Sequence, residues 1–238
     1  MSVSCVPYCV PVLAALLAAG AQAAPVVPPM LLHDGFARFD AGRWIVEAEA
    51  APGDARAATP AVSVRAHALV LDGRAGLTVW LNRRLTGHYE ITYTRTVLDR
   101  GGPNDRVSDL NQFWLANDPA RAAAAAPFGR SGRFADYDSL DMLYAGIGGN
   151  DNTTTRVRRY DGTAARPLLA EYTSRDRLLR GNHPYHVRIV VDGAGSRLYL
   201  DGRPLFAVSG PLPAGGYFGF RSTASRQTIR DFSIRTLR

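Results

Sequence analysis

Residues 184–208 read PYHVRIVVDGAGSRLYLDGRPLFAV. Apolar and polar side chains alternate in the runs PYHVRIVV and SRLYL, which is the period of a β-strand with one buried face. Each run ends at an Asp-Gly pair, Asp192-Gly193 or Asp201-Gly202. Such a pair between alternating runs is a strong signal for a hairpin turn. The stretch therefore predicts successive antiparallel strands joined by tight turns.

The same signals recur along most of the chain. Between Gly87 and Leu98, Tyr89, Ile91 and Tyr93 fall on one face of a period-two pattern. Roughly a dozen short strand-like runs are separated by turn residues, and we find no convincing helix pattern. We therefore predict an all-β protein, a two-sheet antiparallel β-sandwich that forms a single domain.

The N-terminal residues have the pattern of a secretory signal. The apolar run Leu13–Ala19 is too short to span a bilayer, and Ala21-Gln22-Ala23 matches a small-residue cleavage site. We predict a signal peptide over 1–23, an extended lead-in over 24–33 and the folded domain over 34–238. The protein is then secreted or periplasmic, without a membrane span.

The composition of the chain limits the kinds of molecule that it is expected to bind. Both cysteines, Cys5 and Cys9, lie in the predicted signal peptide, so the exported chain has no disulfide and depends on its core. The formal net charge of +7 is carried entirely by arginine and favours an anionic partner such as an acidic polysaccharide. No zinc-ligand spacing or nucleic-acid motif is present. We expect a monomer that uses no cofactor or catalytic metal and binds no nucleic acid, although the fold has room for a structural calcium.

The densest group of polar, aromatic and glycine residues is FADYDSLDMLYAGIGGNDNTTTRVRRY, residues 134–160. It predicts a strand from Phe134 to Tyr144, a glycine-rich turn, and a second strand from Thr153 to Tyr160. Burying so many charged groups without partners is costly. We therefore expect this hairpin to form one wall of a solvent-filled cleft.

The second strand of this hairpin carries an arginine face. Val157 is its apolar residue and is expected to face the core. The opposite face then carries Thr154, Arg156, Arg158 and Tyr160. A guanidinium can bind a carboxylate through two parallel hydrogen bonds, so this face suits an acidic sugar. Alternatively, it is a solvated surface on which the arginines pair with aspartates.

Two parts of the chain resemble known families. The run HVRIVVDGAGSRLYLDGRPLF, then GYFGFR and a closing strand at 229–236, resembles the C-terminal half of concanavalin A-like jelly rolls. The segments SDLNQFWLANDP, DYDSLDMLYAGIGGNDNTTTRVRRY and LLAEYT resemble a family of exported bacterial domains of unknown function, with members among polysaccharide-utilisation proteins. The resemblance covers residues 34–238.

The resemblance implies a two-sheet sandwich whose concave face forms a groove for a glycan. Relatives by fold include lectins, glycoside hydrolases and uronate lyases, and the fold does not choose among them. The spacing of Asp136, Asp138 and Asp141 matches the E-x-D-x-x-E signature of retaining glucanases of this fold, with Asp at both outer positions. Shorter Asp side chains close less of the gap between two catalytic carboxyls. Alternatively, the first two pair with the nearby Arg130 and Arg133.

We predict an exported polysaccharide-active protein that cleaves an acidic, uronate-containing polysaccharide by β-elimination. Arg156 and Arg158 would neutralise the uronate carboxylate and so acidify the α-proton. Tyr144 or Tyr160 would exchange the protons, with arginines lowering the pKa of Tyr144. The residues predicted to bind the substrate are Asn111, Gln112, Trp114, Asn150, Asn152, Thr154 and Arg221.

Two other functions stay open from the sequence. One is a non-catalytic, lectin-like carbohydrate-binding module that uses the same groove. The other is a glycoside hydrolase that uses Asp136, Asp138 and Asp141. Trp114 is also open, because it either stacks on a sugar ring in the groove or belongs to the core. Long segments in compact domains are commonly functional, which makes residues 117–133 a candidate gate over the groove.

Overall fold

The structure is a computed structural model that describes residues 1, 29–50, 61–122, 125–163 and 165–237. Apart from Met1, the predicted signal peptide lies outside the described residues, as do residues 24–28 of the predicted lead-in. Within the described part, no helix is long and apolar enough to cross a membrane. The signal peptide and export therefore stay predictions.

Almost all of the regular structure is β-strand, and every strand pairing among the described residues is antiparallel. The strands are β1 (Met30–Asp34), β2 (Trp44–Ala48), β3 (Val62–Arg65), β4 (Ala68–Leu81), β5 (Leu85–Thr86), β6 (Tyr89–Val97), β7 (Leu110–Asn117), β8 (Asp141–Gly148), β9 (Thr154–Asp161), β10 (Leu168–Tyr172), β11 (Pro184–Asp192), β12 (Gly195–Leu200), β13 (Arg203–Val208) and β14 (Gly215–Thr236). The remaining elements are short: 3-10 helices η1 (Phe134–Tyr137) and η2 (Arg175–Arg177) and one helical turn, α1 (Gly149–Asn152). The predicted all-β antiparallel class is confirmed.

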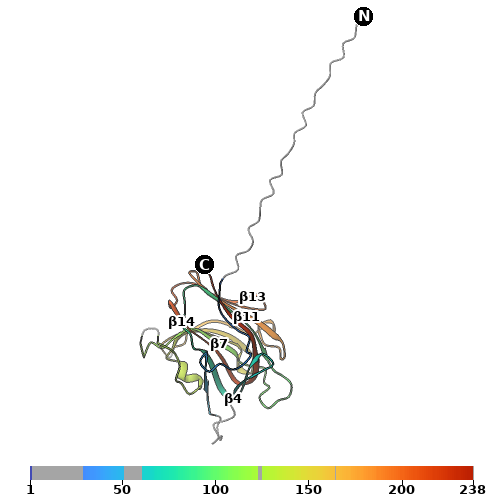
Figure 1. Cartoon of the computed structure of the whole chain (residues 1–238), viewed down its shortest axis with the longest axis vertical. Coiled ribbons are helices and arrows are strands. Elements are labelled where there is room, and N and C mark those ends of the chain that lie inside the picture. Colours follow the sequence, from blue (N-terminus) through green and yellow to red (C-terminus); the bar gives the residue numbers. More distant parts are fainter. Residues whose placement is uncertain (2–28, 51–60, 123–124, 164, 238) are drawn as a thin grey trace.

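The strands form two layers that share β4 and β14 (Figure 1). The first half of β14 pairs with β7 and with 76–80 of β4, whereas its second half pairs with β6 and with 69–73 of β4. One layer therefore runs β10-β9-β8-β7-β14-β4-β2, and we call it the pocket sheet. The other runs β13-β12-β11-β6-β14 and is extended by β1, β3 and the first part of β4. This is the predicted two-sheet sandwich.

The strands that cross between the layers differ from the sequence prediction. The resemblance implies a closing strand at 229–236 that is separate from GYFGFR, but one continuous strand, β14, contains both, and β4 is likewise long and unbroken. The pairing of β14 with β4 shifts register between Thr223 and Ser225, where Ala224 has a φ of 43°. Such a bulge bends a strand without ending it, so one strand can turn a corner of the sandwich.

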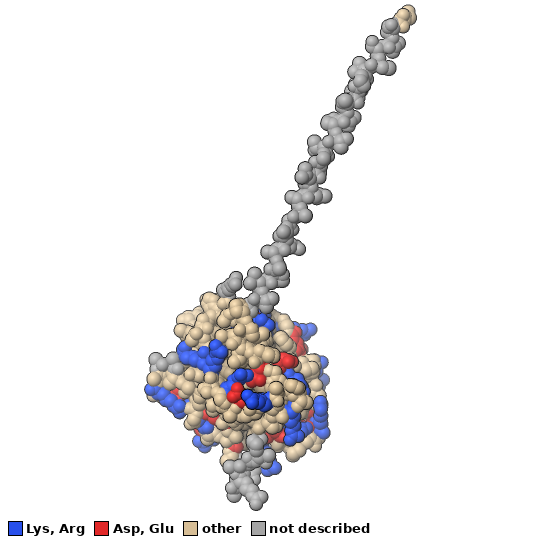
Figure 2. Space-filling view, in the orientation of Figure 1, with Lys and Arg blue, Asp and Glu red and all other residues tan. Residues whose placement is uncertain are grey.

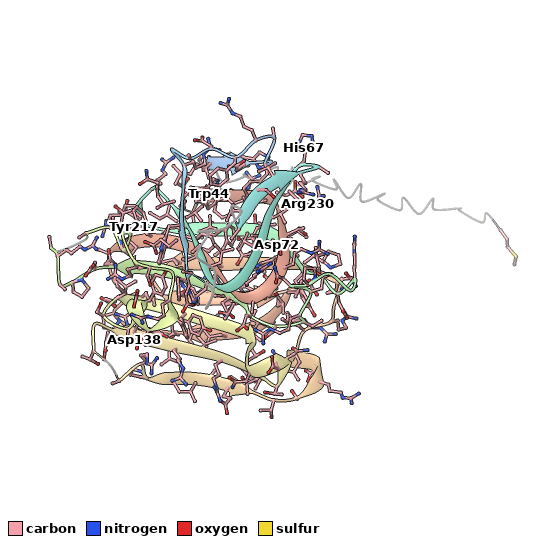
Figure 3. The ribbon with its side chains drawn as sticks, turned by 90° about the horizontal axis from the view of Figure 1, so that it is seen from below. Trp44, His67, Asp72, Asp138, Tyr217 and Arg230 are labelled. Carbon is pink, nitrogen blue, oxygen red and sulfur yellow. The ribbon has the colours of Figure 1, made fainter. Side chains whose placement is uncertain are left out.

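The core lies between the two layers and is rich in aromatic side chains. Trp44 stacks on Phe220 at 5.5 Å between ring centroids and meets the edge of Phe232 at 5.1 Å. Its indole nitrogen donates a 2.9 Å hydrogen bond to the buried carboxylate of Asp34, at the end of β1. Figure 3 shows Trp44 amid these packed side chains. Strand β1 is thus part of the sandwich, although the sequence analysis assigned 30–33 to the lead-in.

A buried arginine on β6 forms hydrogen bonds with two neighbouring strands of the pocket sheet. The Arg95 guanidinium is fully buried and donates 2.7 Å hydrogen bonds to the Gln227 side chain and to the backbone carbonyls of Asn111 and Arg221. Burial lowers its pKa to about 10, because the low-dielectric interior disfavours the charged form. It therefore fixes β7 against β14 directly below the site described next.

Candidate functional site

The outer face of the pocket sheet is partly covered by residues 118–122 and 125–140, which we call the cover. Its apolar side chains, Phe128, Phe134, Tyr137 and Leu140, join a second hydrophobic cluster separate from the main core. The sheet side chains in this cluster are Ile45, Trp80, Phe113, Ala116, Met142, Tyr144, Tyr160 and Tyr217. They come from six strands, β2, β4, β7, β8, β9 and β14. The cover therefore spans most of the width of the sheet.

A buried carboxylate anchors the cover. Glu47 on β2 is 5% exposed, and one of its oxygens accepts hydrogen bonds from the Trp80 indole at 2.9 Å and the Tyr137 hydroxyl at 2.8 Å. The other oxygen accepts from the backbone nitrogens of Gly129 at 2.6 Å and Arg130 at 2.8 Å. A carboxylate with four donors is well satisfied. The described part of the segment predicted to be a gate is thus anchored to the sheet through Glu47, and its role as a gate stays a prediction.

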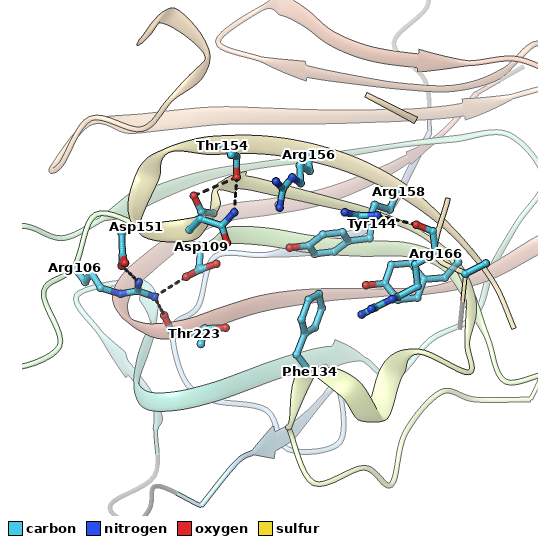
Figure 4. A pocket seen from close by; sticks show the side chains of 15 residues that line it. Arg106, Asp109, Phe134, Tyr144, Asp151, Thr154, Arg156, Arg158, Arg166 and Thr223 are labelled. Carbon is cyan, nitrogen blue, oxygen red and sulfur yellow. Dashed lines mark hydrogen bonds and ion pairs between the residues drawn. The ribbon is translucent and has the colours of Figure 1, made fainter. Parts of the chain in front are cut away.

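Beyond the cover, the outer face of the pocket sheet is hollowed into a polar pocket (Figure 4). Its floor and walls come from β8, β9, residues 165–166 before β10, the α1 turn, the loop before β7, the bend in β14 and the tip of the cover. The lining residues are Arg106, Asp109, Phe134, Tyr144, Gly146, Gly149, Asn150, Asp151, Thr154, Arg156, Arg158, Tyr160, Ala165, Arg166 and Thr223.

The predicted arginine face of β9 is confirmed. Val157 is fully buried in the main core, and Thr154, Arg156, Arg158 and Tyr160 all line the pocket on the other side. Tyr144 lies directly opposite Arg158 in the pairing of β8 with β9 and also lines the pocket. The structure therefore brings together the four residues predicted to be catalytic. Their catalytic roles stay predictions.

The arginines of the pocket differ in their partners. Arg106 pairs with Asp109 and Asp151, Arg156 pairs with Glu171, and Arg166 pairs with Asp138. Figure 2 shows the same interspersion of arginines and carboxylates over the visible face of the body. Arg158 has no carboxylate partner among the described residues, and its guanidinium donates a 2.9 Å hydrogen bond to the Arg166 carbonyl. It is therefore the arginine most available to an anionic ligand.

Two tyrosines face this arginine, and their ionisation differs from the prediction. The Tyr144 ring lies along β8 over Gly146, where any Cβ would overlap its hydroxyl. Burial raises the pKa of Tyr144 well above its usual range, and nearby arginines only partly oppose this. Burial likewise raises the pKa of Tyr160 to about 12, and its hydroxyl is buried. The expectation that arginines lower the Tyr144 pKa is wrong because desolvation outweighs their charge.

The predicted amide ligands separate into two groups. Asn150 lines the pocket, and its amide donates a 3.3 Å hydrogen bond to the Thr154 hydroxyl. Asn111 is buried; its side-chain nitrogen donates to Asp109 at 3.2 Å, and its side-chain oxygen has no partner among the described residues. Asn152 instead bonds the backbone of Leu179 through both amide atoms, so it fixes a loop outside the pocket.

Three residues predicted to bind the substrate are buried elsewhere. Trp114 faces the core between the layers and donates to the Ser196 hydroxyl at 2.9 Å. Gln112 shares that face and is fully buried, bonded to the Tyr93 hydroxyl and the Ala145 carbonyl. Arg221 is on the outer face but is 1% exposed, because the Phe134 ring covers it at 4.7 Å. The structure therefore places none of the three in the pocket.

The three aspartates do not lie along one strand, and each is paired with an arginine. Asp136 belongs to η1 rather than a strand and pairs with Arg133, as the alternative interpretation had it. Asp138 pairs with Arg166 at 3.1 Å instead of Arg130, and it lies beside the yellow strands in Figure 3. Asp141, at the start of β8, pairs with Arg159 at 2.6 Å. Each carboxylate is thus engaged by an arginine, and the predicted strand from Phe134 to Tyr144 is wrong.

Sequence reasoning missed several lining residues, chiefly Arg106, Asp109, Phe134, Arg166 and Thr223. Arg106 lies in a loop rich in Gly, Pro, Asn and Asp, and Asp109 follows that loop. The loop sequence does not indicate which part of the fold it contacts. The charge of the two residues was the only signal, and the chain has many charged residues. Among the described residues, no three His, Cys, Asp or Glu side chains gather closely enough to hold a metal ion. The cofactor prediction stays untested.

The fold and the partly covered outer face define a jelly-roll protein of the concanavalin A-like class. The model of a family described as a domain of unknown function, DUF6250, matches residues 71–232. The chain therefore belongs to this family. A comparison with curated proteins finds no match.

Comparison with solved structures supports the class. A protein of unknown function with a galectin-like fold from Bacillus subtilis superposes with a TM-score of 0.66 at 16% identity, covering 87% of this chain and 96% of that chain. An endo-β-1,3-glucanase from Pyrococcus furiosus gives 0.58 at 9% identity, covering 87% and 94%. The VIP36 exoplasmic/lumenal domain in a Ca²⁺/mannose-bound form gives 0.55 at 14% identity, covering 82% and 83%. At these identities the likeness shows the fold alone.

Proposed function

We propose that this chain is an exported carbohydrate-binding protein that binds an acidic sugar in the pocket on its pocket sheet. The observation that carries the proposal is Arg158, whose guanidinium lines the pocket and has no carboxylate partner among the described residues. Tyr144 and Tyr160 line the pocket as well, and the hydroxyl of Tyr160 is buried. A guanidinium without a carboxylate partner next to the neutral Tyr144 hydroxyl complements a sugar that carries both a carboxylate and hydroxyl groups.

The comparisons support the carbohydrate part of this proposal. Two of the similar structures are named for a glucanase and for a mannose-bound form. A fold does not determine a function, so the acidity of the ligand is inferred from the residues of the pocket. The excess of arginine over carboxylate in the whole chain, +7, adds long-range attraction for an anionic polymer.

Binding is favoured over cleavage by the protonation of the pocket. A β-elimination needs a group that accepts the α-proton. A tyrosine serves this role best when its pKa is lowered toward neutrality, but burial raises the pKa values of both Tyr144 and Tyr160. The carboxylates that line the pocket, Asp109 and Asp151, are both paired with Arg106. Tyr144 can therefore donate a hydrogen bond to a sugar, whereas neither tyrosine is well suited to take its proton.

The test is calorimetric titration of the purified protein with oligomers of galacturonate, glucuronate, mannuronate and guluronate, and with neutral oligomers of glucose and mannose. We expect saturable binding of at least one acidic oligomer and no binding of its neutral counterpart. Near-ultraviolet absorbance of the same mixtures should stay flat. A rise would show an unsaturated sugar and make the protein a lyase. Preference for neutral oligomers would overturn the acidic assignment.

Export is tested separately. We expect the protein to be found outside the cytoplasm with a mass corresponding to cleavage after Ala23, because the residues before it match a signal peptidase site. Intact-mass analysis of the exported protein measures this. Recovery of the full chain from the cytoplasm alone would contradict it.

A further inference from the structure

The pocket is closed on the side away from β9. Phe134, at the tip of the cover, lines the pocket and lies over the Arg221 guanidinium of β14 at 4.7 Å. Gly132, two residues before Phe134 in the cover, lies even closer to the sheet. The Gly132 carbonyl accepts a 2.8 Å hydrogen bond from Arg221, and a Cβ on Gly132 would overlap the backbone of Ala48 and Glu49. The cover therefore leaves no passage over β14, β4 and β2 at this level.

A second wall closes the end of the pocket at the start of β7. Arg106 pairs with Asp109 and Asp151, and it donates further hydrogen bonds to the carbonyls of Thr223 at 2.7 Å and Ala224 at 3.1 Å. One side chain thus joins the loop before β7, the α1 turn and the bend of β14, as Figure 4 shows for Asp109, Asp151 and Thr223. A guanidinium with this many partners is held in place.

The side toward the sheet edge is different. Arg156 and Arg158 on β9 are only half-buried, and on the neighbouring edge strand β10 Leu168 and Glu171 are exposed. A sugar in the pocket can therefore continue in this direction over β9 and β10. It cannot continue in the opposite direction, because the cover is anchored there by the buried Glu47 network and by Gly132.

From this asymmetry we infer that the pocket is blind and recognises the terminal residue of an acidic glycan chain, not an internal segment. The inference rests on the proposed function and narrows it to chain ends. The terminal sugar places its carboxylate at Arg158 and its outermost hydroxyls against the Phe134 and Arg106 walls. The rest of the chain leaves the pocket across β9 and β10.

The test compares probes that differ in length but not in composition. The acidic sugar that binds in the titration above is used as dimer, tetramer, hexamer and long polymer, and each is titrated into the purified protein. We expect one protein to bind per chain at every length. We also expect the dissociation constant per mole of chain to stay within about twofold, since the contacts at the terminus are the same.

Two outcomes are informative in different ways. If several proteins bind each long chain, or if affinity follows the mass of polymer instead of the number of chains, internal segments are recognised and this inference is overturned while acidic binding stands. If no uronate of any length binds, the proposed function fails and this inference fails with it. Partial hydrolysis of the polymer at constant mass provides a control, because it should raise the number of bound proteins in proportion to the new ends.

Discussion

The outer face of the pocket sheet has a covered half, under the cover, and an open half, at the pocket. Similar types of residue have different roles in the two halves. In the covered half, Glu47 receives four hydrogen bonds, and the aromatic rings of Trp80, Phe113 and Tyr137 pack on one another. In the open half, Arg158 has no carboxylate partner among the described residues, and its half-buried guanidinium lines the pocket. Arginine side chains bind carboxylates through charge-assisted hydrogen bonds. An arginine without a carboxylate beside a pocket therefore points to an anionic ligand.

The largest loss of stability is expected when the Glu47 carboxylate, which anchors the covered half, is removed. Glu47→Ala leaves the Trp80 indole, the Tyr137 hydroxyl and two backbone nitrogens without an acceptor. Unsatisfied buried donors are costly, so the free energy of unfolding should fall by about 3–5 kcal/mol. Urea denaturation followed by tryptophan fluorescence measures this.

Glu49→Ala is the matched control for that change. Among the described residues, its carboxylate accepts one hydrogen bond, from the Gly76 backbone at 3.0 Å, and its loss should cost only about 1 kcal/mol. Equal losses in the two variants would show that the Glu47 network does not anchor the cover.

A smaller effect is expected where the two halves meet. Gly146→Ala places a methyl group where the Tyr144 hydroxyl now lies. The ring has to move, and overpacking of this kind costs about 1–3 kcal/mol of stability. Because the ring forms the pocket floor, affinity for the acidic oligomer should fall as well. Gly202→Ala is the control, since a Cβ there meets nothing within 4 Å, although its φ of 74° adds some backbone strain of its own. Unchanged affinity in Gly146→Ala would remove Tyr144 from the binding site.

The smallest effect is expected from pH. The pKa values of Tyr144 and Tyr160 are raised, so neither hydroxyl ionises near neutrality and binding should be flat from about pH 6 to 9. Above the unfolded tyrosine pKa of about 10, the unfolded state releases these protons first, so stability then falls as pH rises. The lowered pKa of Arg95 has the opposite effect on stability, because the folded state releases this proton before the unfolded state does. Affinity that changes tenfold between about pH 6 and 9 would reveal a titrating group that this account lacks.

The fold was largely predictable because local patterns decide it. The alternation of Tyr89, Ile91 and Tyr93 in β6 and the Asp192-Gly193 turn both appear as expected. The orientation of β9 was also predictable, because Val157 is its single aliphatic residue. The continuous course of β4 and β14 was not, since a bulge at Ala224 replaces a turn and depends on both layers.

The site was predictable only where strand alternation applies. Tyr144, Arg156 and Arg158 were found in this way, but Trp114 was not placed, because alternation leaves open which face of β7 meets the core. The cover was beyond sequence reasoning. Its position depends on Glu47, which lies 82 residues before its partner Gly129. Ionisation was misjudged for a related reason, since the burial of Tyr144 depends on Phe134 and Phe113 packing around it.

The most direct measurement compares Arg158→Ala with Arg159→Ala by calorimetric titration of the acidic oligomer. Both variants remove one charge from β9, but only Arg158 lines the pocket, and Arg159 pairs with Asp141 outside it. Loss of a charge-assisted hydrogen bond to a carboxylate is worth about 1.5–3 kcal/mol. We expect Arg158→Ala to weaken binding by roughly 10- to 100-fold and Arg159→Ala to leave it within about twofold of the unsubstituted protein. Equal weakening in both variants, or none in Arg158→Ala, would contradict the assignment of this pocket as an acidic-sugar site.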